Sequence, residues 1–262
     1  MRTRRLPLPA GLTACLVLSF SSPAFAQDAL ELIHKMQQAL GGADRIAAVR
    51  DFEEDAYGDV WTEAGRPIGE VRKRTRWIAP NLLRLDQQGS GNTYVLYFDG
   101  TSGWEILPER GTTRTTGAAI DLVGEELEFA RGYLSGFMAE TWRGIWLADR
   151  MPGYTLASPA PNVIRVTREG RATDIVLDPA TWLPLKHVSV LPVDPARPIP
   201  NETHFIEWTE TAGIRFPSKR TDYRNGAKLR EAKQITSRVN IGLRPQDLSA
   251  KPADSGPVWP SR

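Results

Sequence analysis

The chain has 262 residues, with 33 Lys and Arg against 31 Asp and Glu, and a single cysteine. So small a net charge excludes a strongly basic nucleic-acid-binding domain, and one cysteine excludes an intrachain disulfide framework or a thiolate metal site. The length is sufficient for one large domain that is stabilised by its own hydrophobic core.

The first 26 residues have the pattern of a secretory signal peptide. Three arginines precede an apolar run from Leu12 to Phe20, and the segment ends in Ala24-Phe25-Ala26, a small-x-small sequence of the kind that signal peptidase cuts. We therefore expect a mature chain that begins near Gln27, outside the cytoplasm and by default in the periplasm. Removal of the leader leaves 30 basic against 31 acidic residues, so the mature chain is close to neutral.

Two other interpretations of the leader stay open. Leu12-Thr13-Ala14-Cys15 loosely resembles a lipobox, in which Cys15 would be lipidated and become the new N-terminus. Thr3-Arg4-Arg5-Leu6 resembles the start of a twin-arginine signal, although Pro7 stands where phenylalanine is usual. A Sec leader is the default. No other segment approaches the ~20 apolar residues that span a bilayer, so we expect no transmembrane segment after the leader is removed.

A helix and a group of strands are predicted next. Asp28 to Leu40 carries apolar residues at spacings of three and four and is followed by Gly41-Gly42, which is typical of an amphipathic helix with a glycine stop. Turn-forming residues separate the strands that follow, so we expect an antiparallel meander. Its four strands are Phe52–Trp61, Ile68–Ala79, Leu82–Gln87 and Thr93–Phe98.

The second part of the chain contains a change of period. Asp99-Gly100 is a tight-turn signal that predicts a returning strand, Trp104–Leu107. From Ala119 to about Trp146 the apolar residues recur at three and four without a proline, which predicts one long helix, or two broken near Gly132 or Gly136. A period of two returns after Tyr154. The six strands expected there are Val163–Thr167, Thr173–Leu177, Leu183–Leu191, Thr203–Thr209, Arg215–Tyr223 and Leu229–Val239.

These elements predict a mainly β fold with a helical insert. About eleven antiparallel strands in one chain favour a curved sheet or incomplete β-barrel that is covered by helices. The insert, about 119–148, has a wide aromatic face that must be buried, so we expect it to act as a lid over the open mouth. The expected organisation is one domain, 27–244, followed by a Pro-rich tail, 245–262, that cannot fold alone.

Three motifs resemble those of the outer-membrane lipoprotein carriers, the superfamily of LolA-, LolB- and LppX-like proteins. They are a helix, double glycine and short helix at Met36–Val49, an aromatic-Asp-Gly hairpin at Tyr97–Trp104, and a Leu-Asp turn followed by a strand at Ile175–Lys186. The resemblance spans most of the mature chain and implies a half-barrel that holds acyl chains between a curved sheet and helical lids. It implies architecture more than ligand, because members of such a fold differ in function. The proline-containing stretch Leu191–Pro200 departs from the pattern and is expected to be an extended loop.

The expected ligand site is apolar. A lipid tail makes no hydrogen bonds, so its site requires a concave apolar lining with a polar rim. The alternative interpretation is that the same side chains form a packed core. The candidate ligand-binding residues are Trp77, Leu83, Leu85, Leu96 and Phe98 of the predicted sheet, and Leu134, Phe137, Met138 and Trp142 of the insert.

One predicted strand carries a row of positive charge. Arg72, Arg74 and Arg76 share a face of that strand, so they are candidate contacts for a lipid head group or an acidic partner. The alternative is cross-strand pairing with acidic residues of the preceding strand. Those residues are Glu53, Asp55 and Asp59.

Signals for catalysis are poor. His204 and Glu207 are close in sequence, but their spacing on a strand points them to opposite faces, and Gly132–Gly136 misplaces its serine for a nucleophile elbow. We predict no catalytic residue, no metal and no cofactor. The expected function is a non-enzymatic periplasmic carrier of a lipid, an acyl chain or a lipoprotein, with envelope proteins as further partners. The alternatives are a structural or interaction module of the cell envelope with a self-filled core and, third, a secreted hydrolase.

Overall fold

The computed structural model describes residues 24–89, 92–107, 119–125, 127, 141–191 and 199–251. The helices in these ranges are α1 (Ala24–Ala39), α2 (Ala43–Ala47), α4 (Thr141–Trp146) and α5 (Pro245–Ser249). The strands before α4 are β1 (Asp51–Trp61), β2 (Pro67–Ile78), β3 (Leu82–Gly89), β4 (Asn92–Phe98), β5 (Gly103–Ile106) and β6 (Ile120–Asp121). Those after α4 are β7 (Tyr154–Ala160), β8 (Val163–Arg168), β9 (Arg171–Leu177), β10 (Pro184–Leu191), β11 (Ile199–Thr211), β12 (Ile214–Arg224) and β13 (Ala227–Val239).

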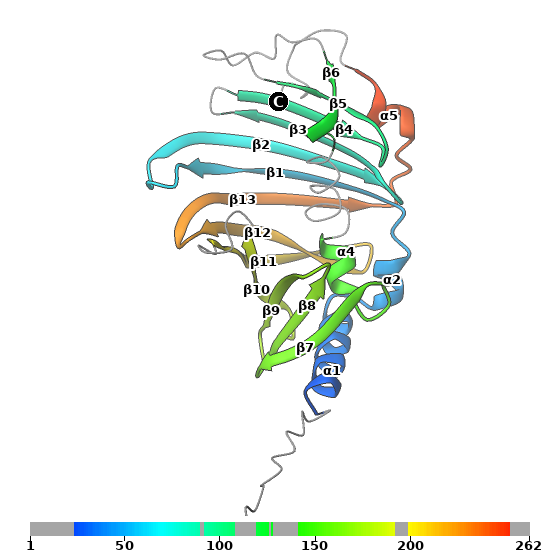
Figure 1. The fold of residues 1–262 in the computed structure, drawn as a ribbon, viewed down its shortest axis with the longest axis vertical. Coiled ribbons are helices and arrows are strands. Elements are labelled where there is room, and N and C mark those ends of the chain that lie inside the picture. Colours follow the sequence, from blue (N-terminus) through cyan, green and yellow to red (C-terminus); the bar gives the residue numbers. More distant parts are fainter. Residues whose placement is uncertain are drawn as a thin grey trace, which may run out of the picture.

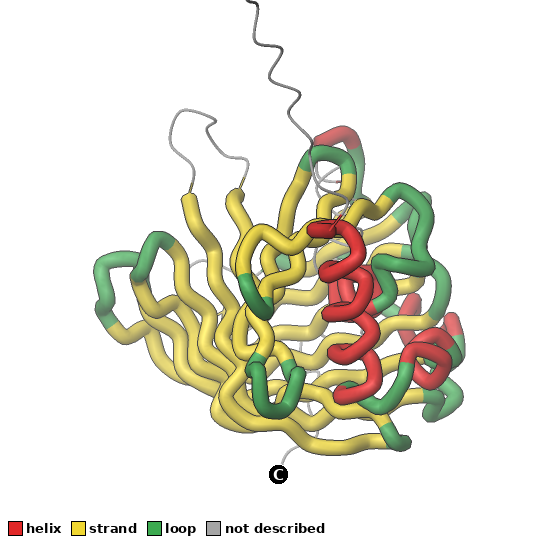
Figure 2. Tube along the Cα trace, turned by 90° about the horizontal axis from the view of Figure 1, so that it is seen from below, coloured by secondary structure: helices red, strands yellow, loops and turns green. Residues whose placement is uncertain are grey.

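The strands form one antiparallel sheet in the order β6-β5-β4-β3-β2-β1-β13-β12-β11-β10-β9-β8-β7 (Figure 1). It consists of two meanders, β1 to β6 and β7 to β13, which the pairing of β1 with β13 joins at the centre. The two end strands, β6 and β7, do not pair with each other, so the sheet is curved but open (Figure 2). This architecture confirms the predicted curved sheet or incomplete barrel, with thirteen strands in place of about eleven.

Two strands account for the difference in number, and one of them corrects a prediction. The predicted helix from Ala119 is wrong at Ile120 and Asp121, which pair with Glu105 and Trp104 as β6. The free backbone groups at the edge of β5 are satisfied by this short pairing, and the helical period that includes Ile120 is coincidental there. The other additional strand is β7, which was not among those predicted. Nearly half of the insert, residues 126 and 128–140, lies outside the described residues.

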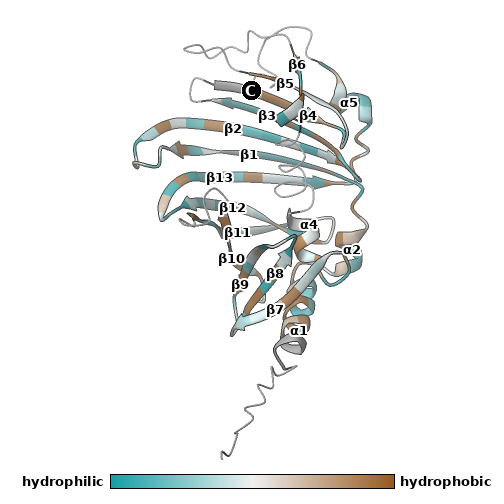
Figure 3. Cartoon of the chain, in the orientation of Figure 1, coloured by the Kyte–Doolittle hydropathy of each residue, from teal (hydrophilic) through white to brown (hydrophobic). Residues whose placement is uncertain are grey.

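The sheet has an inner face, which packs against α1, α2 and α4, and an outer face. Along β2 the residues Val71, Lys73, Thr75 and Trp77 are buried, and those between them are partly exposed. This alternation follows from the two-residue period of a strand. Figure 3 shows that β2 and β13 contain both hydrophilic and hydrophobic segments. The main hydrophobic core lies on the inner face and includes Ile33 of α1 and Ile46 of α2.

The outer face is covered near β3 and β4 by α5, within the segment that was expected to be a tail. Leu248 is fully buried in a cluster with Val95 and with the stacked rings of Tyr97 and Trp104. The buried guanidinium of Arg84 donates hydrogen bonds to the carbonyl oxygens of Leu248 (3.1 Å) and Ala250 (2.6 Å). Burial lowers the pKa of Arg84 from its usual value, although Asp86 beside it favours the charged form. The chain beyond β13 is therefore an integral part of the domain as far as Ala250.

The elbow between α1 and α2 is packed against the turn between β11 and β12. Gly41 has φ of 114°, and a Cβ atom at this position would lie 2.0 Å from the carbonyl oxygen of Gly213. The Leu40 carbonyl, left free at the end of α1, accepts a hydrogen bond from the Arg215 N–H at 2.8 Å. Only glycine permits both the backbone conformation and this close approach.

We predict that Gly41→Ala destabilises the domain more than Gly42→Ala does. Both glycines have positive φ, but a Cβ atom on Gly42 would meet nothing within 4 Å. The Gly42 variant should therefore lose about 1 kcal/mol of unfolding free energy from backbone strain alone, and the Gly41 variant about 2 kcal/mol or more. Urea unfolding followed by circular dichroism measures both. Equal losses would show that the contact between the elbow and the β11–β12 turn is absent.

Candidate functional site

The five sheet residues that were predicted to contact a ligand lie together on the inner face. Trp77, Leu83 and Phe98 are side by side on β2, β3 and β4, and the Leu85–Leu96 pair forms the adjoining row. None of the five side chains is more than 4% exposed. The structure thus brings these residues into one continuous apolar surface. Their role in binding a ligand stays a prediction.

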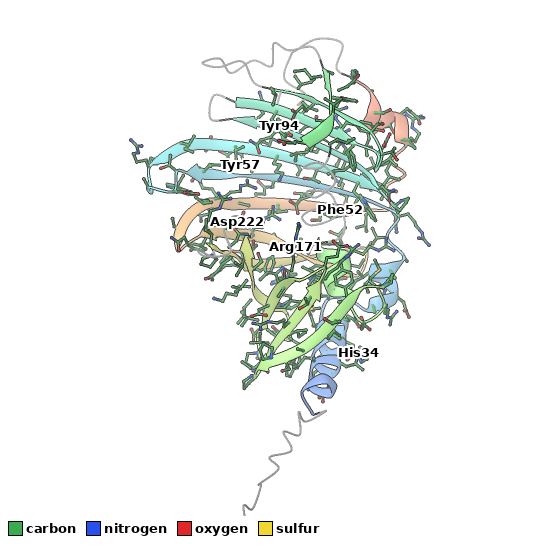
Figure 4. All side chains as sticks on the ribbon, viewed as in Figure 1. His34, Phe52, Tyr57, Tyr94, Arg171 and Asp222 are labelled. Carbon is green, nitrogen blue, oxygen red and sulfur yellow. The ribbon has the colours of Figure 1, made fainter. Side chains whose placement is uncertain are left out.

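Aromatic side chains extend this surface across the centre of the sheet. The ring of Phe52 on β1 (Figure 4) lies 5.6 Å from that of Phe216 on β12, which is 6.2 Å from the ring of Trp146. Trp146 is also 6.3 Å from Trp208 of β11. The sequence analysis did not single out these four residues as lining. Alternation shows which face a residue takes, but the contact between β1 and β12 depends on a pairing between the two ends of the chain.

The end of the predicted lid is attached to the N-terminal helices. The amide of Gln37 on α1 donates to the carbonyl oxygen of Trp146 (2.8 Å) and to the carboxylate of Asp149 (2.6 Å). Arg143 of α4 donates to the carbonyl oxygen of Ala47 at 3.0 Å, and its guanidinium lies 5.6 Å from the ring of Trp77. These contacts place α4 beside the apolar inner face.

The four insert residues of the predicted site cannot be placed in the same way. Leu134, Phe137 and Met138 lie outside the described residues. Trp142 is part of α4, but its side chain is not among those described. Contact between these four side chains and a ligand remains a prediction.

A polar row lies beside the apolar surface. The register across the sheet places Ser237 of β13 opposite Glu54 of β1, and Glu54 opposite Thr75 of β2. All three are at least 93% buried. Arg220 of β12 donates two hydrogen bonds to the Glu54 carboxylate, at 3.3 and 3.2 Å. Lys73, two residues before Thr75, is also buried, so the inner face contains charge as well as apolar surface.

The three arginines that were candidate head-group contacts lie on the opposite side of the sheet. Arg72 donates two hydrogen bonds to Asp55, at 3.1 and 2.6 Å, and Arg74 lies 3.7 Å from the same carboxylate. Arg76 is paired with Asp86 at 2.6 Å. The structure therefore does not bring this row together with the apolar lining. The alternative interpretation, cross-strand pairing of these arginines with acidic residues of β1, is correct for Asp55. Glu53 pairs instead with Arg238, and Asp59 with Lys233.

Two of the three histidines lie beside a carboxylate, and Nε2 of His34 is 3.4 Å from Asp149. His204 lies 2.7 Å from Glu202, which also accepts a hydrogen bond from Lys186 at 2.8 Å. In the described part of the chain, no group of three or more His, Cys, Asp and Glu residues is arranged to hold a metal ion. A search of the same residues finds no helix that is both long and apolar enough to cross a membrane.

His187 faces the inner side of β10 and is kept neutral. Its register neighbour on β9 is the fully buried Ile175, and the ring of Phe205 meets it edge-on at 4.8 Å. The residue as a whole is only partly buried, but its Nε2 atom is completely shielded and has no hydrogen-bond partner among the described residues. Loss of hydration on burial lowers the pKa of His187 to about 4.

Comparison with solved structures shows that this architecture is shared. The chain superposes on a DUF1329 family protein from Desulfovibrio piger with a TM-score of 0.51 and 12% identity, over 85% of this chain and 96% of that one. With a LolA superfamily protein from Nitrosomonas europaea the TM-score is 0.50 and the identity 10%, over 87% of this chain and 98% of that one. With a domain from Vibrio parahaemolyticus that is named for outer membrane lipoprotein sorting, the TM-score is 0.48 and the identity 14%, over 85% of this chain and 97% of that one. No family model and no curated protein matches the sequence. The chain thus has the same fold as the LolA superfamily protein, and this likeness agrees with the fold that the resemblance of the three motifs predicted.

We predict that His187 makes the domain less stable in mild acid. The pKa of His187 in the folded state is below its ordinary value of 6.5, so between about pH 6.5 and pH 4 the unfolded chain binds more protons. The stability that the neutral imidazole of His187 contributes is fully present above pH 6.5 and is lost as the pH falls toward 4. A pKa shift of this size corresponds to about 1 to 3 kcal/mol of unfolding free energy. The lower part of this range applies because the ring retains some exposure to solvent. Urea unfolding of the wild type and of His187→Gln at pH 7.5, 6 and 4.5 measures it.

The two proteins should show the same pH dependence above pH 6.5, because His187 is neutral there in both states. Between pH 6 and 4.5 the wild type should lose more unfolding free energy than the variant. Identical curves over the whole range would contradict a buried, neutral imidazole.

Proposed function

We propose that this chain is a periplasmic carrier, without catalytic activity, that holds the acyl chain of a lipid or lipoprotein against the inner face of its sheet. The observation that carries the proposal is the continuous apolar surface of Trp77, Leu83, Leu85, Leu96 and Phe98 inside an open, curved sheet. Apolar surface of this kind, bordered by a few polar groups, is what a lipid tail requires. The shared fold with a LolA superfamily protein supports it as an analogy of architecture.

The proposal extends to location and to the insert. The leader pattern of residues 1–26 supports export, with anchoring through Cys15 as the alternative. The helical period of the insert supports a lid that opens for the ligand and then covers it. A lid with methionine and aromatic side chains would adapt to ligands of different shape.

One observation favours a second candidate function. The five inner-face side chains are almost completely buried, as they would be in a core that is filled by the protein itself. In that case the chain would be a structural or interaction module of the cell envelope and would have no lipid to carry. The two candidates differ in whether an apolar ligand can reach these residues.

Photolabelling tests this difference directly. We expect a fatty acid with a photoreactive group at the end of its chain to label inner-face residues of β3 and β4, such as Leu85 and Leu96. Val95, next to Leu96 and equally buried, faces the outer side and should remain unlabelled. Mass spectrometry of the digested protein locates the label, and native mass spectrometry of the protein purified from its own periplasm shows whether a lipid is already bound. Labelling confined to the outer face, or no labelling, would support the interaction module.

Exchange of Phe137 or Met138 for aspartate tests the lid. If these side chains cover the ligand, a buried charge at either position should reduce uptake of a fluorescent fatty acid at least tenfold and leave the sheet folded by circular dichroism. Val123→Asp is the matched control, because Val123 is 66% exposed at the start of the insert and should tolerate a charge. Unfolding of the Phe137 and Met138 variants would instead identify the two residues as core.

A further inference from the structure

The hydrogen-bond ladder between β12 and β13 stops partway along the strands. It runs only from the Arg220–Ala232 pair to the Arg224–Ala227 pair, although β12 begins at Ile214 and β13 continues to Val239 (Figure 1). The Arg215 N–H, which would face β13, is instead taken by the Leu40 carbonyl of the α1–α2 elbow. Pro217, two residues further along β12, has no N–H to donate, so neither position supplies a donor to β13.

Beyond the point where this ladder stops, the end of β11 contacts β13. The hydroxyl of Thr211, at the end of β11, donates a hydrogen bond to the backbone carbonyl of Ser237 at 3.1 Å. Together with the Arg220–Ala232 pair, this bond encloses an interruption in the middle of the sheet. We call this interruption the β12–β13 window.

A cavity of about 380 Å³ occupies the β12–β13 window. Its lining includes the aromatic ring of Trp208, which also contacts Trp146 of the inner face. The charged residues at its edge, Lys219 and Glu207, neutralise one another at 2.6 Å. Five lining residues carry hydroxyl groups: Thr209, Thr211, Ser218, Thr236 and Ser237.

Ser237 is the residue that points to a ligand. It is 97% buried, and its Oγ atom has no hydrogen-bond partner in the part of the chain that the structure describes. The same holds for Oγ1 of Thr75, which is 99% buried on the other side of Glu54. Buried hydroxyls without partners are uncommon in native proteins because their lost hydration is not replaced. Two of them, both in the row beside Glu54, are explained if a ligand supplies the missing hydrogen bonds.

The register shows how such a ligand would lie. The row that contains Ser237, Glu54 and Thr75 continues without a break into Leu85 and Leu96 on β3 and β4. One row of the inner face is thus polar over three strands and apolar over the next two. An amphiphile with its polar part beside the β12–β13 window would place its chain on the proposed lipid surface.

The charges of the row select among head groups. Glu54 lies between the two hydroxyls and is held by both terminal nitrogens of Arg220, so the pair has no net charge. At the β12–β13 window Glu207 is likewise paired with Lys219, and Lys233 is paired with Asp59. These pairs are already neutral and offer no free positive charge to a phosphate or a carboxylate, and the cation nearest to the row, Lys73, is buried two residues before Thr75. Hydroxyl groups donate to carboxylate, accept from guanidinium and do both with Ser or Thr.

We infer that the β12–β13 window and the row beside it bind an uncharged, hydroxyl-bearing head group, either glycerol or a sugar, of the lipid whose chain the inner face holds. The inference rests on the proposed carrier function and specifies its substrate class. A test therefore compares four ligands with the same acyl or alkyl chain: a monoacylglycerol, an alkyl glucoside, a fatty acid and a lysophosphatidate. We expect the first two to bind at least tenfold more tightly than the two anionic lipids. Whether the monoacylglycerol or the alkyl glucoside binds more tightly shows which head group, glycerol or sugar, the site prefers.

Ser237→Ala and Thr75→Val should reduce this preference without unfolding the protein. Each substitution removes a hydroxyl that has no partner among the described residues, so the thermal midpoint should stay the same or rise. Affinity for the hydroxyl-bearing lipids should fall about three- to tenfold, and affinity for the fatty acid should not change. Ser158→Ala is the matched control, since Ser158 is a buried serine on β7 whose hydroxyl already donates to the Ala160 carbonyl. It should leave the preference intact.

The outcomes separate the two proposals. Equal affinity for all four lipids, unchanged in the Ser237 and Thr75 variants, overturns the head-group inference and leaves the carrier function in place. Tighter binding of the anionic lipids also overturns it. Failure of all four lipids to bind overturns the carrier function, and with it the head-group inference.

Discussion

The pairing of β1 with β13 is the interaction on which the rest of the structure depends. It joins two meanders that are continuous in sequence only through the long insert, and among the described strands it is the one ladder between opposite ends of the chain. A glycine permits it: a Cβ atom on Gly58 would lie 1.8 Å from the Glu231 carbonyl oxygen, at the point where the register shifts. Just beyond the end of β13, the N–H groups of Ile241 and Gly242 donate hydrogen bonds to the carboxylate of Asp51, the first residue of β1. These bonds fix the end of the ladder.

This central pairing also decides which side chains meet on the inner face. Phe52 is brought beside Val239, and Glu54 beside Ser237, only because β1 and β13 pair in this register. A shift by one residue would turn both neighbours to the outer side. The polar row and the ion pair from Glu54 to Arg220 therefore depend on this register, whereas the apolar surface depends on the registers between β2, β3 and β4.

Much of the fold could be predicted from the sequence because its signals are local. Turn residues and alternation located the strands of both meanders except β6 and β7, and alternation placed Trp77, Leu83 and Leu85 on one face. β6 escaped prediction because it is a two-residue strand defined by its partner on β5 and not by its own pattern. The same limit applies to Arg72. Its charge is visible in the sequence, but its two hydrogen bonds to Asp55 and its place on the face opposite the apolar lining can be seen only in the folded sheet.

The β12–β13 window shows why the candidate site could be predicted only in part. Ser218, Lys219 and Ser237 have no unusual sequence pattern, although Pro217 beside them is a local signal that pairing can stop there. The second cause is a contact across the molecule, in which the Leu40 carbonyl takes the N–H of Arg215, and no local pattern shows it.

The polar row bears on the choice between a carrier and a self-filled module. A core that served stability alone would gain from apolar residues at Thr75 and Ser237, because their hydroxyls are buried without partners. Glu54 and Arg220 add a further desolvation cost that well-packed apolar residues would avoid. These costs fall along one row, next to the apolar surface and to a cavity in the sheet. A self-filled core offers no reason for that arrangement, whereas a site for an amphiphile requires polar and apolar surface side by side.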